Sequence, residues 1–258
     1  MDRSELVEAW KREEQQPFSG WDFSYLKGRM LEEHPAWSYP ARGAELMRGA
    51  SSVIDLDTGG AERFRELQGH WPERVVATEN YPPNVELAAQ RLLPLGAHVV
   101  NAPMTDRSLL PFADGAFDLV LNRHSAINAR EVARILSPGG TFLTQQIHGL
   151  WAHDLSVVFD AEPQWPEATP EVNVPRLRAA GLDIVDTQEW SGRLSFVDVG
   201  AVVYYLRAVP WMVPGFSVET HLEYLLVLQH RIESGEGLDY LARKYLIEAR
   251  KGGNHAWV

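Results

Sequence analysis

Short apolar runs alternate with helix-prone segments between residue 51 and about residue 150. Five apolar runs bounded by polar or turn residues predict strands: Ser52–Leu56, Arg74–Thr78, Ala97–Val100, Phe117–Leu121 and Gly140–Gln145. Three segments between them predict helices: Ala61–Gln68, Asn84–Leu93 and Asn128–Leu136. Alternation of strands and helices at this spacing favours right-handed crossovers and a parallel sheet with helices on both faces.

The flanking regions show a different pattern. Residues 1–50 predict one or two helices, with a loop around Pro17 and Gly20 and then an aromatic-rich stretch. Residues 161–170 contain three prolines and predict a loop. Beyond them the chain predicts a helix, two strands, a second helix and a last strand, in this order: Asn173–Ala180, Asp183–Asp186, Val197–Tyr205, His221–Ser234 and Lys244–Ala249. Late strands of a large mixed sheet are commonly antiparallel.

Charge and composition exclude several classes of protein. The formal net charge of −11 and the pI near 5.3 argue against an unaided nucleic-acid binder, which normally has a basic face. The absence of cysteine excludes disulfides, thiolate metal sites and cysteine nucleophiles, and it fits a reducing cytoplasm. The first 16 residues lack the apolar core of a signal peptide, and the apolar stretch Val199–Val213 is too short to span a bilayer. We therefore expect a cytoplasmic protein that does not span a membrane.

The first predicted strand ends in the acidic, small-residue turn Asp55-Leu-Asp-Thr-Gly-Gly60. In doubly wound folds, ligands bind at the carboxyl ends of the strands. Glycine lets the backbone approach a ligand, and the following helix N-terminus offers N–H groups to a ligand carboxylate. Glu79 follows the second strand, 24 positions beyond Asp55, where a carboxylate can accept both ribose hydroxyl protons. A solvated strand end is the alternative interpretation of Glu79.

Further motifs follow this turn in a fixed order. They are Asp106 with Leu110-Pro-Phe112, then Asp114-Gly-Ala-Phe-Asp-Leu-Val120, then Leu136-Ser-Pro-Gly-Gly140. Together with the turn and Glu79, this pattern resembles the class I S-adenosylmethionine-dependent methyltransferases, and among them the small-molecule group described as methyltransferase domain proteins. The resemblance covers about residues 50–145, and the flanking regions carry no motif that identifies a substrate.

The resemblance implies an α/β fold with a Rossmann-like, doubly wound sheet of seven strands, mainly parallel with an antiparallel last strand. It implies one methyltransferase domain, made of a helical cap over residues 1–50, an S-adenosylmethionine-binding core over residues 51–150, and the rest of the sheet with substrate-side insertions over residues 151–258. The methionine end of the cofactor is expected on the turn, ribose on Glu79 and adenine near Asp106. The expected cofactor-binding residues are Asp55, Asp57, Thr58, Gly59, Gly60, Glu79, Asp106 and Asn122.

Two residues depart from the family pattern. Asp57 stands where the family usually has its first glycine, and Ala61 replaces the third. We expect Ala61 to be tolerated, because it opens the helix and adds only a methyl group. The Asp57 carboxylate would repel the carboxylate of the cofactor, although it can pair with the ammonium group instead.

The resemblance places the transferred methyl group toward the end of the fourth strand, Leu121–Ser125. His124 is the candidate general base, which is needed only if the acceptor has a proton to lose. A histidine that caps the backbone at a strand end is the alternative. Candidate acceptor contacts are Trp21, Tyr25, Arg123, Gln145, Gln146 and His148. The histidines do not stand at a recognised metal-ligand spacing, so we expect no metal.

The predicted function is transfer of a methyl group from S-adenosylmethionine to an oxygen or nitrogen of a small molecule. A non-catalytic cofactor-binding protein with this fold stays open as an alternative, and an RNA methyltransferase is disfavoured by the acidity. The turn lacks Gly-x-Gly-x-x-Gly, which disfavours an NAD-dependent oxidoreductase. Asn80-Tyr-Pro-Pro-Asn84 follows the second strand and not the fourth, so we reject a methyltransferase of base or glutamine amino groups. The sequence does not indicate the acceptor or the oligomeric state.

Overall fold

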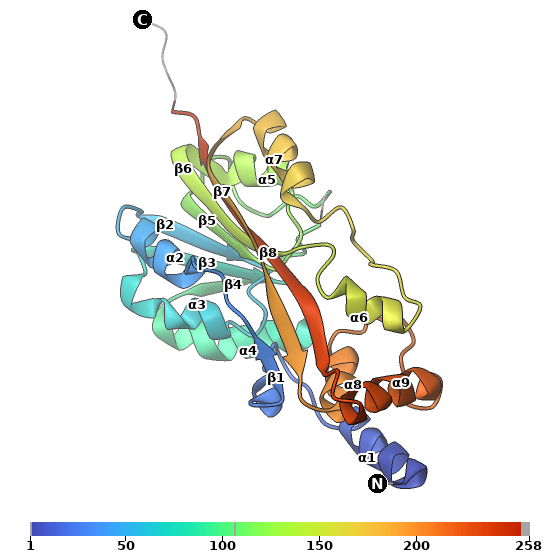
Figure 1. Ribbon diagram of the computed structural model, residues 1–258. Coiled ribbons are helices and arrows are strands. Elements are labelled where there is room, and N and C mark those ends of the chain that lie inside the picture. The colour runs from blue at the N-terminus through green and yellow to red at the C-terminus, as the bar shows by residue number, and fades with distance from the viewer. Residues whose placement is uncertain (1, 106, 254–258) are drawn as a thin grey trace, which may run out of the picture. The chain divides into compact units, whose positions relative to one another are not determined.

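The computed structural model describes residues 2–105 and 107–253 of the chain. These residues form two compact units, each assembled from separate stretches of the chain. Unit 1 consists of the described residues within Met1–Pro35, His148–Glu167 and Trp190–Arg243, and unit 2 consists of those within Ala36–Ile147, Ala168–Glu189 and Lys244–Val258. The long strands β7 (Leu182–Phe196) and β8 (Leu238–Lys251) contribute residues to both units (Figure 1).

Unit 2 alternates strands and helices along the chain. Besides parts of β7 and β8, its strands are β2 (Ser52–Leu56), β3 (Arg74–Glu79), β4 (His98–Asn101), β5 (Phe117–Arg123) and β6 (Leu136–Ile147). Its helices are α2 (Tyr39–Met47), α3 (Glu62–Glu66), α4 (Pro82–Leu92), α5 (Ala129–Ile135) and α7 (Pro170–Ala179), with the 3-10 turns η2 (Gln68–His70) and η3 (Leu93–Leu95). Local sequence explains several helix starts. Ser38 and Asn128 cap α2 and α5 through their side chains, and prolines occupy the first turn of α4.

The sheet of unit 2 has the strand order of a doubly wound fold, β7-β8-β6-β5-β2-β3-β4. Strand β2 pairs in parallel with β3 and β5, β3 pairs in parallel with β4, and β5 with β6. Strand β8 runs antiparallel to β6. The predicted Rossmann-like, mainly parallel sheet with an antiparallel last strand is confirmed, but the described sheet has eight strands and not seven, because β1 (Met30–Glu32) pairs with β7 at its edge. Strand order reverses between β2 and β5, and ligands bind at such switch points.

Alternate residues of the strands face two different cores in unit 2. Val53, Leu119 and Leu143 pack with α2, α3 and α4, whereas Ile54 and Val120 pack with α5 and α7. Figure 1 shows the two groups of helices on opposite sides of the sheet. All residues of β2 are buried. A parallel strand that helices cover on both faces needs such a continuous apolar run.

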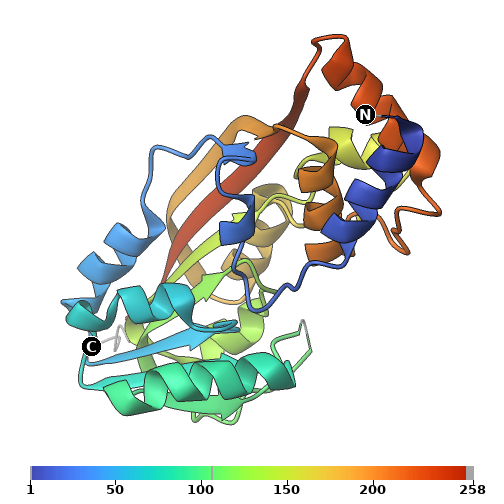
Figure 2. The ribbon, with the colours of Figure 1, turned by 90° about the horizontal axis from the view of Figure 1, so that it is seen from below.

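Unit 1 is mainly helical and has its own apolar core. Besides parts of β7 and β8, its elements are α1 (Arg3–Glu14), η1 (Ser24–Leu26), β1 (Met30–Glu32), α6 (His153–Val158), α8 (Val199–Ala208) and α9 (Leu222–Glu233). Helix α1 packs against α8, and Figure 2 shows them side by side in blue and orange. Strand β1, which the sequence does not predict, pairs antiparallel with the part of β7 near Phe196.

The predicted elements of unit 2 are confirmed, with shifted ends. Strand β7 continues well past its predicted end at Asp186, and α3 is shorter than the predicted helix. No helix in the described ranges of the chain is long and apolar enough to cross a membrane.

The strand predicted over Val197–Tyr205 is wrong, because this segment forms the first turns of helix α8. The side chain of Asp198 caps the helix by accepting the N–H of Ala201 at 2.8 Å. Nine of the ten residues of α8 are buried. A helix that is apolar on all sides has no amphipathic period, and its β-branched residues then resemble a buried strand.

Candidate functional site

The turn after β2 has an unusual backbone. Asp57, Gly59 and Ala61 have φ values of 51°, 62° and 65°, in the left-handed region that glycine adopts easily and other residues rarely do. The N–H of Asp57 donates to Oγ1 of Thr78 at 3.1 Å, and the N–H of Thr58 donates to the Thr78 carbonyl at 2.8 Å. Strained backbone of this kind clusters at functional sites. Ala61 precedes α3 as its N-cap, so the helix opens one residue later than predicted.

Glu79, the last residue of β3, closes this turn with its side chain. Its Oε2 accepts the N–H of Gly59 at 2.7 Å, and its Oε1 accepts the N–H groups of Asn80 and Tyr81 at 2.8 and 2.9 Å. The side chain is buried, with 5% of the residue exposed. A carboxylate has about four lone-pair sites, so Glu79 keeps capacity for a further donor. Glu79, the residue predicted to bind ribose, therefore lies beside the glycine turn.

Two further carboxylates lie close to Glu79. Burial raises the pKa of Asp55 to about 7, and the charges of Asp57 and Glu79 add to the rise. Burial likewise raises the pKa of Asp57 to about 6, and the charge of Glu79 adds to it. Oδ2 of Asp57 accepts the hydroxyl of Ser125, whereas Oδ1 is buried without a hydrogen-bond partner among the described residues. This cluster of carboxylates favours a ligand that carries positive charge.

A buried polar network lies at the ends of β5 and β6. The Oδ1 of Asn122 accepts the hydroxyl of Thr144 at 3.0 Å and the amide Nε2 of Gln146 at 2.5 Å. The Nδ2 of Asn122 donates to the carbonyl of Ala126 at 3.4 Å. Asn122 is fully buried, and Gln146 is 6% exposed. Asn122 therefore holds the loop after β5 through its amide, and Gln146 holds the side chain of Asn122.

His124 follows β5 with a positive φ of 59° and an exposed side chain. Its N–H donates to the carbonyl of Gln145 at 2.9 Å, and its Nε2 lies 3.3 Å from the Nε2 of Gln145. The Oε1 of Gln145 accepts the indole N–H of Trp37 at 2.9 Å. Protein atoms crowd the ring although part of it stays exposed. This crowding, followed by the positive charges of Arg123, Lys244 and Arg63, holds the pKa of His124 well below its ordinary value.

The structure brings most of the predicted residues together in unit 2. Thr58, Gly60 and the half-buried Arg123 lie on the same strand ends as the carboxylates and His124. Asp106 lies outside the described residues. Trp21, Tyr25 and His148 belong to unit 1, where His148 accepts the N–H of Leu150 through Nδ1 at 3.0 Å.

Sequence reasoning missed two members of the site. Ser125 lies in the segment expected to face the methyl group, and a hydroxyl directly after a strand end was a usable signal. Trp37 gave none, because it precedes every motif and contacts a residue 108 positions further along the chain.

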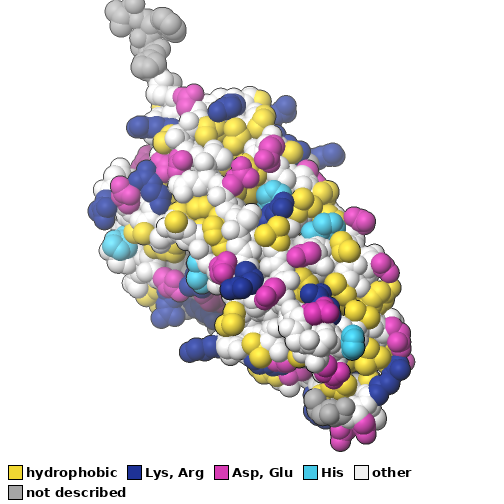
Figure 3. All heavy atoms as spheres, in the orientation of Figure 1, with side chains coloured by type: hydrophobic (Ala, Val, Ile, Leu, Met, Phe, Trp, Pro, Cys, Tyr) yellow, Lys and Arg dark blue, Asp and Glu magenta, His cyan; other side chains and the backbone are white. Residues whose placement is uncertain are grey.

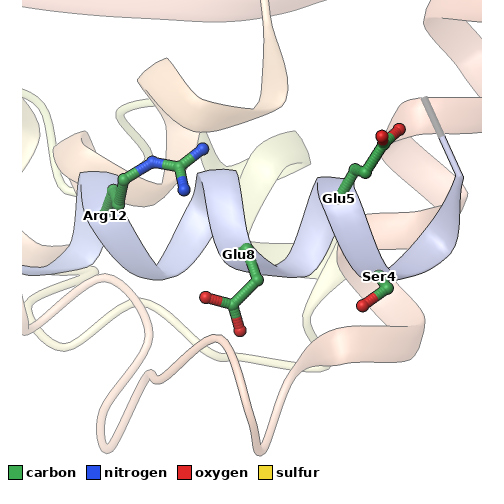
Figure 4. A pocket seen from close by; sticks show the side chains of 4 residues that line it. All are labelled: Ser4, Glu5, Glu8 and Arg12. Carbon is green, nitrogen blue, oxygen red and sulfur yellow. The ribbon is translucent and has the colours of Figure 1, made fainter.

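The surface has two shallow depressions, and the second of them borders the glycine turn, where Arg91 donates to the carbonyl of Gly60. One runs along α1 and is lined by Ser4, Glu5, Glu8 and Arg12 (Figure 4). Figure 4 shows the four side chains projecting from a single helix, without a convergent polar group. The other is lined by side chains of α3 and α4 that include the ion pair of Glu62 with Arg91. Mixed charges on helix surfaces of this kind identify no ligand, so we assign none to either depression.

Residues 54–144 match the methyltransferase-domain family. The matched segment begins in β2 and ends in β6, so it contains the acidic turn, Glu79 and His124. No sequence among the curated proteins matches the chain.

Solved structures show the same fold at low sequence identity. YcgJ from Bacillus subtilis has a TM-score of 0.60 at 17% identity, over 84% of this chain and 99% of YcgJ. A protein of unknown function from Deinococcus radiodurans has a TM-score of 0.58 at 16% identity, over 96% of this chain and 98% of that one. An S-adenosylmethionine-dependent methyltransferase from Mesorhizobium loti has a TM-score of 0.51 at 16% identity, over 83% of this chain and 98% of that one.

The chain therefore has the fold of the class I S-adenosylmethionine-dependent methyltransferases. Within that fold, residues 54–144 are the part that matches the methyltransferase-domain family.

The residues of the turn fit S-adenosylmethionine chemically. This cofactor carries positive charge on its sulfonium and ammonium groups, and the turn presents the carboxylates of Asp55, Asp57 and Glu79. The buried, unpartnered Oδ1 of Asp57 is an acceptor of the kind that an ammonium group requires. The replacement of glycine by Asp57 therefore suits pairing with the ammonium group better than repulsion of the carboxylate.

Proposed function

We propose that the protein is an S-adenosylmethionine-dependent methyltransferase that methylates an oxygen or nitrogen of a small molecule. The observation that carries the proposal is the acidic turn at the switch point of the sheet, which contains Asp57 and whose Gly59 donates to Glu79. The match of residues 54–144 to the methyltransferase-domain family supports it. A sheet with this order but without the carboxylates would support only the fold.

Different residues of unit 2 would bind the cofactor and the acceptor. Glu79 would accept ribose hydroxyls, and Asp57 with Asp55 would hold the ammonium group. S-adenosylmethionine, when bound, supplies a methyl group on a positively charged sulfur. His124 and Arg123 would contact the acceptor at the end of β5, and Gln145 would orient His124. Much of the rate acceleration of such transfers comes from holding the two reactants in contact.

The remaining proposed contacts are less specific. Trp21 and Tyr25 are exposed aromatic side chains of unit 1, at 49% and 42%, and their contact with the acceptor stays a prediction. Acceptor contact by His148 of unit 1 stays a prediction, as does adenine contact by Asp106, whereas the bonds of Gln146 to Asn122 and Thr144 leave it no such role. We also propose a cytoplasmic location, which the cysteine-free composition supports.

Calorimetric titration of the purified protein with S-adenosylmethionine, S-adenosylhomocysteine and NAD tests the cofactor. We expect micromolar binding of the first two and none of NAD. The carboxylate cluster should favour S-adenosylmethionine over S-adenosylhomocysteine, since only the former carries the sulfonium charge. No binding of either adenosyl compound would remove the proposal.

A non-catalytic cofactor-binding protein is the second candidate, and Asp57 is the observation that favours it. A buried carboxylate where the family usually has glycine changes the shape and charge of the turn. Cofactor binding without methyl transfer to any compound in a broad acceptor screen, followed with methyl-labelled cofactor, would support this alternative over the enzyme.

A further inference from the structure

The hydrogen bonds around His124 determine where its proton lies. The indole N–H of Trp37 can only donate, so the Gln145 oxygen that it contacts at 2.9 Å must be the amide carbonyl. The amide nitrogen of Gln145 then faces Nε2 of His124, at 3.3 Å. An amide NH₂ group can only donate, so Nε2 must be the acceptor. A neutral imidazole with an acceptor at Nε2 carries its proton on Nδ1.

This arrangement opposes a role for His124 as a general base. A base must accept a proton on Nε2 or Nδ1, but Gln145 already occupies Nε2 and Nδ1 is already protonated. Gln145 cannot turn its oxygen toward the ring without leaving the Trp37 indole unpaired, because Gln145 is 7% exposed and has little access to water. His124 is exposed, and its Nδ1 makes no hydrogen bond within the described ranges of the chain. The ring therefore offers an N–H donor to a ligand.

The charges around His124 indicate the ligand that this donor suits. Arg123 lies beside it in sequence, and Arg63 of α3 and Lys244 of β8 are close enough for their charges to act on the ring. Positive charges that act on the ring, together with its N–H donor, favour an anionic ligand. The carboxylates of Asp55, Asp57 and Glu79 lie at the neighbouring turn, which separates a site for positive charge from a site for negative charge within unit 2.

We propose that His124 binds a carboxylate of the methyl acceptor through its Nδ1–H, and that Gln145 and Trp37 are positioning residues that hold the ring in this tautomer. The identity of the ligand as the acceptor rests on the proposed function, whereas the tautomer does not. A carboxylate has no proton to lose, so a site without a base can serve it. Methyl transfer to a carboxylate exchanges one C–S bond for one C–O bond, leaves the C–S electron pair on sulfur and releases no proton.

Nitrogen NMR of the full-length protein tests the tautomer without cofactor or turnover. Long-range ¹H–¹⁵N correlation distinguishes Nδ1–H from Nε2–H, and the resonances of His124 are those lost in His124→Gln. We expect a neutral Nδ1–H ring at pH 7. An Nε2–H ring or an imidazolium in the wild-type protein would overturn the proposal.

Substitution of the positioning residues tests how the tautomer is held. Trp37→Phe removes the indole donor and frees the Gln145 amide to turn. We therefore expect a substantial population of the Nε2–H tautomer and a higher pKa of His124. Gln145→Glu places a carboxylate beside Nε2 and should raise the pKa of His124 by about 1 unit or more. Trp71→Phe is the matched control, because the buried indole N–H of Trp71 has no hydrogen-bond partner among the residues that the structure describes. An unchanged His124 tautomer in Trp37→Phe would exclude the positioning role.

Benzoate and its neutral counterpart benzamide, as probes, test the class of ligand. We expect benzoate to shift the His124 resonances saturably, and benzamide to bind at least about tenfold more weakly or not at all. Equal effects of the two probes, or none, would overturn the carboxylate assignment. Titration with S-adenosylmethionine on the same samples separates this failure from failure of the proposed function, because the cofactor binds at the acidic turn whatever the acceptor is.

Discussion

Buried polar side chains distinguish unit 2 from unit 1. Of the fourteen buried polar or charged residues in the described part of the chain, all but Ser156 belong to unit 2. Many of them stand at or near the carboxyl ends of strands, as Glu79, Asn122 and Gln145 do. The core of unit 1 is instead apolar and rich in aromatic pairs, such as Phe23 with Tyr205. Burial of a polar group costs free energy unless it is paired, so their concentration in unit 2 indicates where the fold maintains chemistry.

Formal charge divides the units in the opposite direction. Unit 1 contains 18 acidic and nine basic residues, whereas unit 2 contains 17 and 15. The net charge of −11 therefore belongs mostly to unit 1, although unit 2 holds the carboxylate cluster. Figure 3 shows acidic and basic side chains interspersed on the face that it presents. The net charge of the protein therefore does not indicate its ligand, because ligand binding depends on a few charged groups at the site.

The largest expected effect comes from Glu79→Ala in unit 2. The substitution removes the predicted ribose contact, and we expect cofactor binding to weaken by about 1–3 kcal/mol, or roughly five- to 150-fold. It also leaves three backbone N–H groups without their acceptor, which should lower the free energy of unfolding by about 3 kcal/mol. Calorimetry and chemical denaturation measure the two effects. Glu73→Ala, at an exposed position of the same unit, is the control. Unchanged cofactor affinity in Glu79→Ala would remove this residue from the site.

The second prediction concerns pH and Asp57. The native state keeps the Asp57 proton up to about pH 6, whereas the unfolded carboxyl loses it near its ordinary pKa of 3.8. The native state thus binds more protons between these values, so stability falls as pH rises through this window and stays lower above it. Asp57→Asn removes the charge, and we expect a gain of about 2 kcal/mol at pH 8 and little change below pH 4.

Denaturation of this variant at several pH values checks the prediction, with the exposed Asp183→Asn as the control. A gain in Asp57→Asn that does not depend on pH would mean that relief of backbone strain, and not charge, is responsible. The same variant should bind S-adenosylmethionine about tenfold more weakly if Asp57 holds the ammonium group. Tighter binding would instead show that Asp57 repels the carboxylate.

The third prediction separates acceptor chemistry from cofactor binding within unit 2. His124→Ala should lower turnover by about tenfold, as expected for the loss of one hydrogen-bond donor to a charged group, while cofactor affinity changes little. His98→Ala, at an exposed strand position, serves as the comparison. An unaltered rate in His124→Ala would reduce His124 to a structural role.

The smallest effect is expected from Trp21→Ala in unit 1. Trp21 is half exposed and contacts Trp211 edge-on at 5.7 Å, so its loss should cost only about 1 kcal/mol of stability. Cofactor affinity should stay within about twofold of the wild type, while KM for an acceptor rises several-fold. Steady-state kinetics and calorimetry measure both. If Trp21→Ala lowered cofactor affinity as much as Glu79→Ala does, cofactor binding would not depend on unit 2 alone.

The parallel strands of the fold could be predicted because few other structures accommodate a short apolar run followed by a turn. Ser52–Leu56 contains the apolar pair Val53 and Ile54 before an acidic residue, and two glycines follow shortly after it, which fits a buried parallel strand and a tight turn. The segment that becomes α8 could not be predicted, because a fully buried helix and a buried strand are both continuous apolar runs. Strand β1 has only three residues and depends on pairing with β7, so the local sequence does not predict it.

The candidate site was predictable where its residues follow strand ends directly. Asp55, Glu79 and His124 were identified in this way, because parallel strands bring their carboxyl ends to one edge of a sheet. The protonation of the site was not predictable, since burial and neighbouring charge set the pKa of Asp55 and Asp57. Asn122 and Gln146 were expected to face ligands, but the structure shows them bonded to each other inside the fold.

The sequence by itself determined the order of strands and helices, the acidic turn and the family resemblance, because these depend on residue type and spacing along the chain. Only the tertiary structure decided that Trp37 contacts Gln145, and through it set the hydrogen bond that Gln145 makes with His124. Periodicity and motifs report on neighbours within one element. Contacts between residues far apart in the chain arise when whole elements pack, and they fix the proton on His124 in a way that no local pattern encodes.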